Sequence, residues 1–341
     1  MSRFERSTLI AALMLATAAC TSDPVDKAAK ARIFSPEDPP KVVASAAEKL
    51  PPEDVADNPR VARRILGMDA AEVTERLGPH TYNAQVDFEW SARDAAPMKL
   101  SEKRTLQAGP GGVSGDFHGQ LENSRDQGLE VMRVGGKVYA RNRYGPFRQR
   151  LRDRGMAERT RAELTGALRD MDGLFQGRML LEPQGTITYE GRTAWRYQVK
   201  LGEKPDETAS KQLPTLLAPK NGRDETTRRR LAFFEHRVPQ SLDGEVLVDA
   251  ATSVVLKTHL DGRLEVPASK SPEAASLHIT LDTTLTEIGR DPKLQPPEKF
   301  LPDEDKPQGI ADALDRFGIP RAKNGADGGT PGETDPDDEA P

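Results

Sequence analysis

Short segments in which apolar and polar residues alternate constrain the fold of this chain more than any other feature. The clearest is Tyr82–Trp90, where every second residue is apolar and the residues between them are polar or charged. A period of two is typical of a β-strand that buries one face. Weaker or shorter patterns of this kind predict further strands at 98–107, 113–121, 129–134, 137–143, 186–189, 193–201, 245–248, 253–266 and 276–288.

Short turns between these segments indicate how the strands pair. Gly135-Gly136 separates two strand segments and is typical of a two-residue hairpin turn, and Glu190-Gly191-Arg192 joins two others. Parallel strands need crossover connections of a dozen or more residues, so short turns favour antiparallel pairing. We therefore expect a mainly β fold with few helices, built as an antiparallel curved sheet or incomplete β-barrel.

A few segments have helical spacing instead. In the stretch 61–77, Asp69 and Glu72 fit a capping box, and Gly78-Pro79 ends the segment. A central helix inserted midway in the sheet is indicated by apolar residues at three- and four-residue steps: Leu164, Leu168, Met171, Leu174 and Phe175. A polar insertion at 203–223 leads to a short helix at 225–236, and 294–300 finishes the domain.

Prolines are crowded into the two ends of the chain. Of 27 prolines, 16 lie in residues 23–59 and 292–341. Polar, proline-rich segments cannot bury enough apolar surface to offset the entropy that they lose on ordering. We expect a flexible tether at 20–58, one folded domain at 59–302 and a disordered tail at 303–341.

The first residues are typical of an export signal. Arg3 and Arg6 precede an eleven-residue run, Leu9–Ala19, which is too short to span a bilayer. The run leads into Cys20, the chain's one cysteine. This pattern resembles a bacterial lipoprotein signal, which implies a signal peptide at 1–19 and acylation of Cys20 by diacylglycerol and palmitate. The alternatives are ordinary cleavage after Ala18 and an uncleaved anchor.

Composition and motifs exclude several classes of function. The formal net charge is −5, whereas nucleic-acid binders are usually basic. A single cysteine excludes a disulfide framework and cysteine-based metal sites. The segment 112–115 (Gly-Val-Ser-Gly) lacks the spacing of a nucleophile elbow, and no histidine pair has metal-ligand spacing, although His259 and His278 could face each other across adjacent strands. We expect no enzymatic activity, catalytic residue, metal, cofactor or nucleic-acid partner.

Residues 141–161 form a strongly basic run. Eight arginines stand against only Asp153 and Glu158. Four of the arginines alternate and would share one side of an extended chain: Arg148, Arg150, Arg152 and Arg154. In an envelope protein such a stripe would contact anionic headgroups or a protein partner. The alternative is a solvated loop that is balanced by acidic residues elsewhere.

Apolar strand faces are the strongest candidates for a binding site. Thirteen of the chain's 17 aromatic residues lie between 82 and 234. One long helix covers little of such a sheet, so its apolar face either packs on a second layer or encloses a ligand. The candidate cavity-lining residues are Tyr82, Val86, Phe88, Trp90, Trp195, Tyr197, Val199 and Leu201. An ordinary β core is the alternative.

Two C-terminal segments carry a family resemblance. The stretch 244–257 (GEVLVDAATSVVLK) resembles the strand–turn–strand of LolA-like and LppX-like envelope proteins, in which the first strand ends in Asp, as at Asp249, and the turn carries Thr, as at Thr252. Ser253 stands where that family commonly has Gly. The stretch 294–300 (LQPPEKF) is similar to the family's terminal proline-containing segment. The resemblance implies an incomplete β-barrel that helices close over a hydrophobic cavity.

These features together favour a lipid-anchored envelope protein. The resemblance implies that it binds a lipid, an acyl chain or a lipoprotein in its cavity, for transport, assembly or sensing. Thr21, where an Asp would resemble an inner-membrane retention signal, favours the outer membrane, facing the periplasm. The alternative is a non-catalytic interaction module of an envelope complex, with a solid core and no ligand.

Overall fold

The structure is a computed structural model that describes residues 52–55, 58–92, 96–150, 153, 155–205, 232–269 and 274–302. The chain divides into two units at Pro302, and all described residues belong to the first. The expected signal peptide, most of the tether and the C-terminal tail lie outside these ranges, so their boundaries stay predictions.

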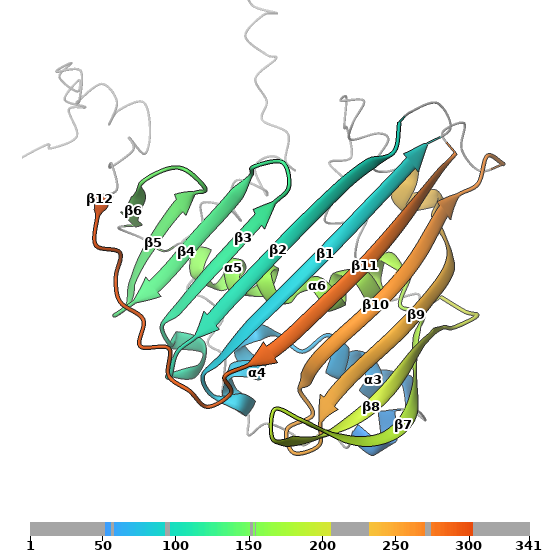
Figure 1. Cartoon of the computed structure of the whole chain (residues 1–341), viewed down its shortest axis with the longest axis horizontal. Coiled ribbons are helices and arrows are strands. Elements are labelled where there is room, and N and C mark those ends of the chain that lie inside the picture. The colour runs from blue at the N-terminus through green and yellow to red at the C-terminus, as the bar shows by residue number, and fades with distance from the viewer. Residues whose placement is uncertain are drawn as a thin grey trace, which may run out of the picture. The chain divides into compact units, whose positions relative to one another are not determined.

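One twelve-stranded sheet dominates the described part of the chain (Figure 1). Its strands are β1 (His80–Ala92), β2 (Met98–Ala108), β3 (Phe117–Asn123), β4 (Gly128–Val134), β5 (Lys137–Asn142), β6 (Phe147–Arg150), β7 (Met179–Tyr189), β8 (Arg192–Leu201), β9 (Val238–Asp249), β10 (Val255–Val266), β11 (Ala275–Thr286) and β12 (Phe300–Pro302). Their order across the sheet is β12-β6-β5-β4-β3-β2-β1-β11-β10-β9-β8-β7. The two edge strands do not pair with each other, so the sheet is open, and the expectation of a mainly β, incomplete-barrel architecture is confirmed.

Chain order explains this arrangement. Strands β1 to β6 run from the middle of the sheet to one edge, and β7 to β11 return from the other edge until β11 pairs with β1. All of these pairs are antiparallel, as the short turns predicted. The strand patterns did not predict β6 or β12. Strand β12 pairs in parallel with β6 after residues 287–299 cross back along the end of the sheet (Figure 1). Phe300 of β12 packs edge-on against Tyr139, with ring centroids 5.0 Å apart.

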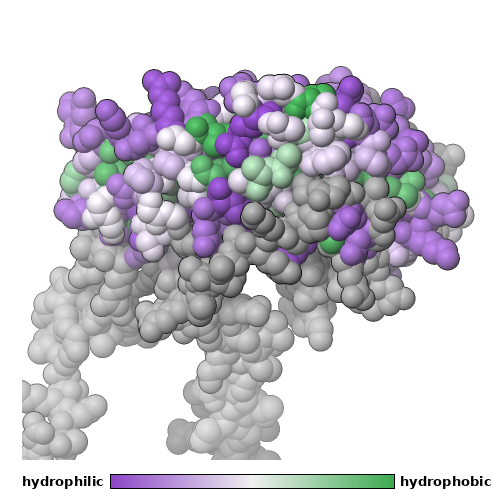
Figure 2. All heavy atoms as spheres, turned by 90° about the horizontal axis from the view of Figure 1, so that it is seen from below, coloured by the Kyte–Doolittle hydropathy of each residue, from purple (hydrophilic) through white to green (hydrophobic). Residues whose placement is uncertain are grey.

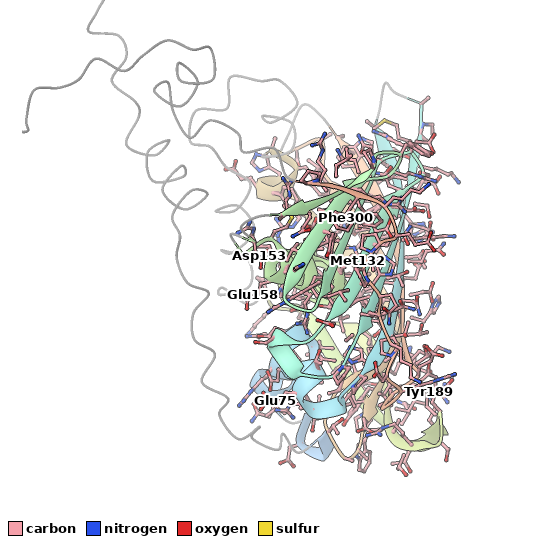
Figure 3. The ribbon with its side chains drawn as sticks, turned by 90° about the vertical axis from the view of Figure 1, so that its left-hand side faces the viewer. Glu75, Met132, Asp153, Glu158, Tyr189 and Phe300 are labelled. Atoms are coloured by element: carbon pink, nitrogen blue, oxygen red, sulfur yellow. The ribbon has the colours of Figure 1, made fainter. Side chains whose placement is uncertain are left out.

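The helices lie together on one face of the sheet, which we call the helix side. They are α3 (Pro59–Leu66), α4 (Ala70–Leu77), α5 (Met156–Thr165) and α6 (Ala167–Leu174), with short 3₁₀ segments η1 (Pro52–Val55) and η2 (Gly112–Ser114) and a helical stretch at 232–236. Figure 3 shows this layering from the side: Glu75 of α4 and Glu158 of α5 lie on the same side of the strands. Asp69 caps α4 as expected, because its carboxylate accepts a hydrogen bond from the backbone N–H of Glu72 at 2.8 Å.

Two glycines in the strands allow the helices to approach the sheet closely. A Cβ on Gly119 would lie 2.4 Å from the side chain of Leu164, and a Cβ on Gly262 would lie 2.3 Å from the ring of Phe175. The side chains of Leu164 and Phe175 are both almost fully buried. The expected central helix therefore docks through the apolar side that its spacing predicted, although it breaks at Gly166 into α5 and α6.

Three strands differ from the sequence prediction by more than two residues at one end. Strand β7 begins at Met179 rather than 186, because it is an edge strand whose stretch 182–188 is exposed and does not alternate. Strand β9 begins at Val238 rather than 245, and a register shift opposite Arg263/Leu264 disturbs its period. Strand β3 begins at Phe117, because residues 112–114 form a 3₁₀ turn.

Candidate functional site

The helix side of the sheet is apolar and the other side is polar. On β1 the buried side chains of Tyr82, Ala84 and Val86 alternate with partly exposed Asn83 and exposed Gln85. The same alternation on β10 and β11 continues the apolar surface across the middle of the sheet. On the side of the molecule seen in Figure 2, hydrophilic residues cover most of the described surface, and hydrophobic residues form only small separate areas. Apolar burial is therefore concentrated between sheet and helices.

A small cavity lies between the helix layer and the sheet. Its volume is about 50 Å³. It is lined by Ile65, Leu66, Met68, Val73, His80, Tyr82, Thr165, Leu168, Val254, Val255, Thr283 and Leu285. Helices α3, α4 and α6 and the last residue of α5, Thr165, therefore supply one wall. The ends of β1, β10 and β11 supply the other wall.

Two ring side chains bring polar atoms to this apolar cavity. His80 is 1% exposed, its Nδ1 lies 2.9 Å from the carbonyl oxygen of Gly78, and burial lowers its pKa, so it is neutral at neutral pH. The hydroxyl of Tyr82 is buried and has no hydrogen-bond partner among the described residues. Burial also raises the pKa of Tyr82, so its hydroxyl keeps its proton.

The eight predicted cavity-lining residues all belong to one core cluster, but Tyr82 alone among them lines the cavity. Val86, Tyr197 and Val199 are buried within the core, whereas Phe88, Trp90, Trp195 and Leu201 are partly buried and packed against it. The indole of Trp90 packs edge-on against Phe233, with ring centroids 5.0 Å apart. Strand alternation identified the core face, but it could not indicate that α3 and α4 supply the opposite wall.

Two of the four arginines of the predicted stripe lie within the described residues, both on one strand. Arg148 and Arg150 lie on β6, opposite Ala140 and Val138 of β5, and share a strand face with them. Arg152 and Arg154 lie outside the described residues. Elsewhere in the run, Arg141 pairs with Glu130 at 2.6 Å. Arg161 is buried in α5 and donates to the hydroxyl of Thr74 at 3.1 Å.

Histidines on the polar side of the sheet pair with carboxylates. His259 lies 2.7 Å from Asp282, and His278 lies 2.6 Å from Asp261. Because the residue opposite His278 is Arg263, the two histidines do not face each other across the strands. Within the described ranges, no three His, Cys, Asp or Glu side chains form a group that could hold a metal ion.

The turn that carries the family resemblance is held by Asp249. Arg192 donates to both carboxylate oxygens of Asp249, at 3.0 and 2.8 Å, and the backbone N–H of Thr252 donates at 3.0 Å. Burial would raise the pKa of Asp249, but these hydrogen bonds outweigh it and hold the pKa below its usual value. Arg76 of α4 donates to the carbonyl oxygen of Thr252 at 2.8 Å, which ties the cavity's helical wall to this turn.

None of the helices in the described ranges is both long and apolar enough to cross a membrane. No protein-family model matches the sequence, and no curated protein matches it.

Solved structures do match the chain. LprF from Mycobacterium bovis aligns over 70% of this chain and 98% of its own, at 14% identity and a TM-score of 0.29. The lipoprotein LppX from Mycobacterium tuberculosis aligns over 66% and 97%, at 11% identity and a TM-score of 0.25. A LolA superfamily protein from Nitrosomonas europaea aligns over 65% and 95%, at 12% identity and a TM-score of 0.18. These structures include a lipoprotein and a LolA superfamily protein, and residues 244–257 and 294–300 resemble segments of LolA-like and LppX-like proteins. At these identities and TM-scores the alignments assign neither a family nor a function to this chain.

Proposed function

We propose that this protein is an envelope lipoprotein that binds an acyl chain, a lipid or an acylated protein between its helices and the apolar face of its sheet. Acylated Cys20 holds it at the membrane, with the outer membrane facing the periplasm as the expected location. The partners are lipid or lipoprotein ligands and other envelope proteins, and the role is binding rather than catalysis.

The observation that carries this proposal is the cavity between α3–α4 and the ends of β1, β10 and β11. Its lining is apolar apart from two hydroxyl-bearing threonines, a neutral imidazole and a phenol. It stands at the edge of a continuous apolar layer, so a hydrocarbon chain entering there would meet core side chains in place of water. An open sheet with helices on one side can widen this layer by outward movement of the helices, without breaking any strand pair.

The size of the cavity supports the second candidate, an interaction module with a solid core. Ligand sites usually enclose about 300–1,000 Å³, whereas this cavity encloses about 50 Å³. A long acyl chain therefore requires displacement of the helix layer. If the layer does not move, the protein binds partners through its surface alone.

Ligand uptake distinguishes these two functions. Thr283 lines the cavity, and its neighbour Thr284 lies on the opposite face of β11. We expect Thr283→Phe to fill the cavity and to lower the uptake of a neutral fluorescent lipid probe by the full chain at least about tenfold. The matched variant Thr284→Phe adds the same ring on the polar side and should leave uptake unchanged. Equal uptake by both variants, or no uptake by the delipidated wild type, would favour the interaction module.

Anchoring is tested separately. Cys20→Ser removes the acylation site, so the protein should leave the detergent-extracted membrane fraction and remain as unprocessed or soluble chain. Cell fractionation and intact-mass measurement report this change. An unchanged fraction together with an unchanged mass would contradict the lipoprotein assignment.

A further inference from the structure

The cavity and the sheet beside it contain hydroxyl groups whose hydrogen-bonding capacity is unmet. The hydroxyls of Tyr82 and Thr258 are both buried, and neither has a hydrogen-bond partner in the described part of the chain. Tyr82 lines the cavity, and Thr258 stands opposite Thr283, which also lines it. A buried polar group without a partner is unfavourable and uncommon in folded proteins. A bound group that meets these hydroxyls would remove that cost.

Strand register places these hydroxyls on one face of the sheet, on β1 and β10, with β11 between them. Tyr82 pairs with Leu285 of β11, and the adjoining row on the same face contains Ala84, Thr283 and Thr258. Adjacent rows on one strand face are about 7 Å apart. The register therefore places Tyr82 and Thr283 in the cavity lining, with Thr258 opposite Thr283 on the next strand.

The charge around these hydroxyls is already balanced. The residues that line the cavity include no Asp, Glu, Lys or Arg, and His80 is neutral. Arg104 is the nearby cation that acts on Tyr82, but it lies 2.6 Å from Glu102 and 3.9 Å from Asp170. Arg161, the buried cation that acts on His80, interacts in turn with Glu158 and Asp69. A carboxylate entering the cavity would therefore find no uncompensated positive charge, and burying it would be strongly unfavourable.

We propose that the cavity binds the uncharged carbonyl group of a fatty acyl ester, with the Tyr82 hydroxyl donating to the carbonyl oxygen, and that it excludes the carboxylate of a free fatty acid. The Thr258 hydroxyl supplies a second donor from β10, on the other side of β11. This inference rests on the proposed lipid-binding function and adds to it the chemical form of the ligand.

Three competitors of equal chain length test the inference. Methyl palmitate, palmitate and hexadecane are compared at pH 8 for displacement of N-phenyl-1-naphthylamine, a neutral probe, from the full chain. Methyl palmitate should compete at least about tenfold better than palmitate. Tyr82→Phe removes one oxygen, and we expect it to weaken methyl palmitate about five- to tenfold while leaving hexadecane unchanged. Thr258→Val, which keeps the side-chain shape, should act in the same direction.

Tyr139→Phe is the matched control, because Tyr139 is a buried tyrosine of a separate cluster away from the cavity. It should leave all three competitors unchanged. Palmitate that competes as well as methyl palmitate would overturn the inference. So would a Tyr82→Phe variant that binds methyl palmitate as well as the wild type does, because the hydroxyls would then serve only bound water. A variant that weakens methyl palmitate and hexadecane equally would overturn it too. Failure of both ester and hexadecane to displace the probe would refute the lipid-binding function itself, and this inference with it.

Discussion

Asp249 and its neighbours show what single residues contribute to this fold. The turn after β9 could be predicted from local sequence, because Asp and Thr at these positions hydrogen-bond nearby backbone groups. The main partner of Asp249 could not be predicted in this way. Arg192 is 57 residues away in the sequence and contacts Asp249 only when β8 pairs with β9. Ser253 has a φ of 59°, a left-handed conformation that favours glycine, which gives a physical reason for the glycine common there in the resembling family.

The lowered pKa of Asp249 predicts how the stability of the protein changes at acidic pH. The folded pKa of Asp249 lies below its usual value of 3.8, so its contribution to the free energy of unfolding is fully present above that pH and is lost as the pH falls through the lowered pKa. Asp249→Asn should therefore destabilise the protein at pH 7, and the difference from wild type should shrink below about pH 4. Urea unfolding across pH measures this. Asp243→Asn, an exposed position on the same strand, should show no such trend; a difference that stays constant with pH would contradict the prediction.

At the scale of elements, the helix layer is seated by complementary shapes. The sequence predicted which residues of the central helix face the core, because helical spacing is local. It could not predict that Gly119 and Gly262 receive them, because that pairing depends on the final position of α5 and α6 over the strands. The crossing at 287–299 was also missed, since a non-periodic segment that runs along the end of a sheet has no local signature.

Gly262 and Phe175 should behave as a coupled pair. Gly262→Ala places a methyl group 2.3 Å from the Phe175 ring and should lower the free energy of unfolding by about 1–3 kcal/mol. Phe175→Leu removes the clashing atoms, so the double variant should be more stable than the sum of the single effects, by about 0.5–3 kcal/mol. Gly119→Ala clashes with Leu164 instead, and combining it with Phe175→Leu should give additive effects. Denaturant midpoints measure these changes in stability. Additive effects in both pairs of substitutions would refute this view of helix docking.

At the scale of the whole molecule, strand patterns predicted the architecture of the sheet but not the volume of the cavity beside it. Period-two segments and short turns were sufficient for an open antiparallel sheet with one apolar face. The volume between that face and the helices depends on how far α3 and α4 stand from the strands, and no sequence period reports this distance. The predicted aromatic lining shows the consequence, because Trp90 and Trp195 pack against the core while other residues line the cavity.

Trp90 and Trp195 test whether the sheet and the helix layer act together as one binding site. Full truncation of a close-packed Trp costs about 3–5 kcal/mol. Trp90 and Trp195 are only partly buried at the margin of the core, so we expect Trp90→Ala and Trp195→Ala to cost less, about 1–3 kcal/mol, and to leave the protein folded. If the apolar layer opens to admit an acyl chain, both variants should also lose uptake of the neutral lipid probe.

Tyr139→Ala is the control for this pair, because Tyr139 is buried in a separate small cluster. It should lower the denaturant midpoint by at least as much as either Trp variant, yet leave probe uptake by the folded fraction unchanged. Full losses of about 3–5 kcal/mol with intact uptake in both Trp variants would mean that the tryptophans only fill a solid core. A loss of uptake that follows stability alone, in all three variants, would mean the same, because binding would then report the amount of folded protein and not the lining of a site.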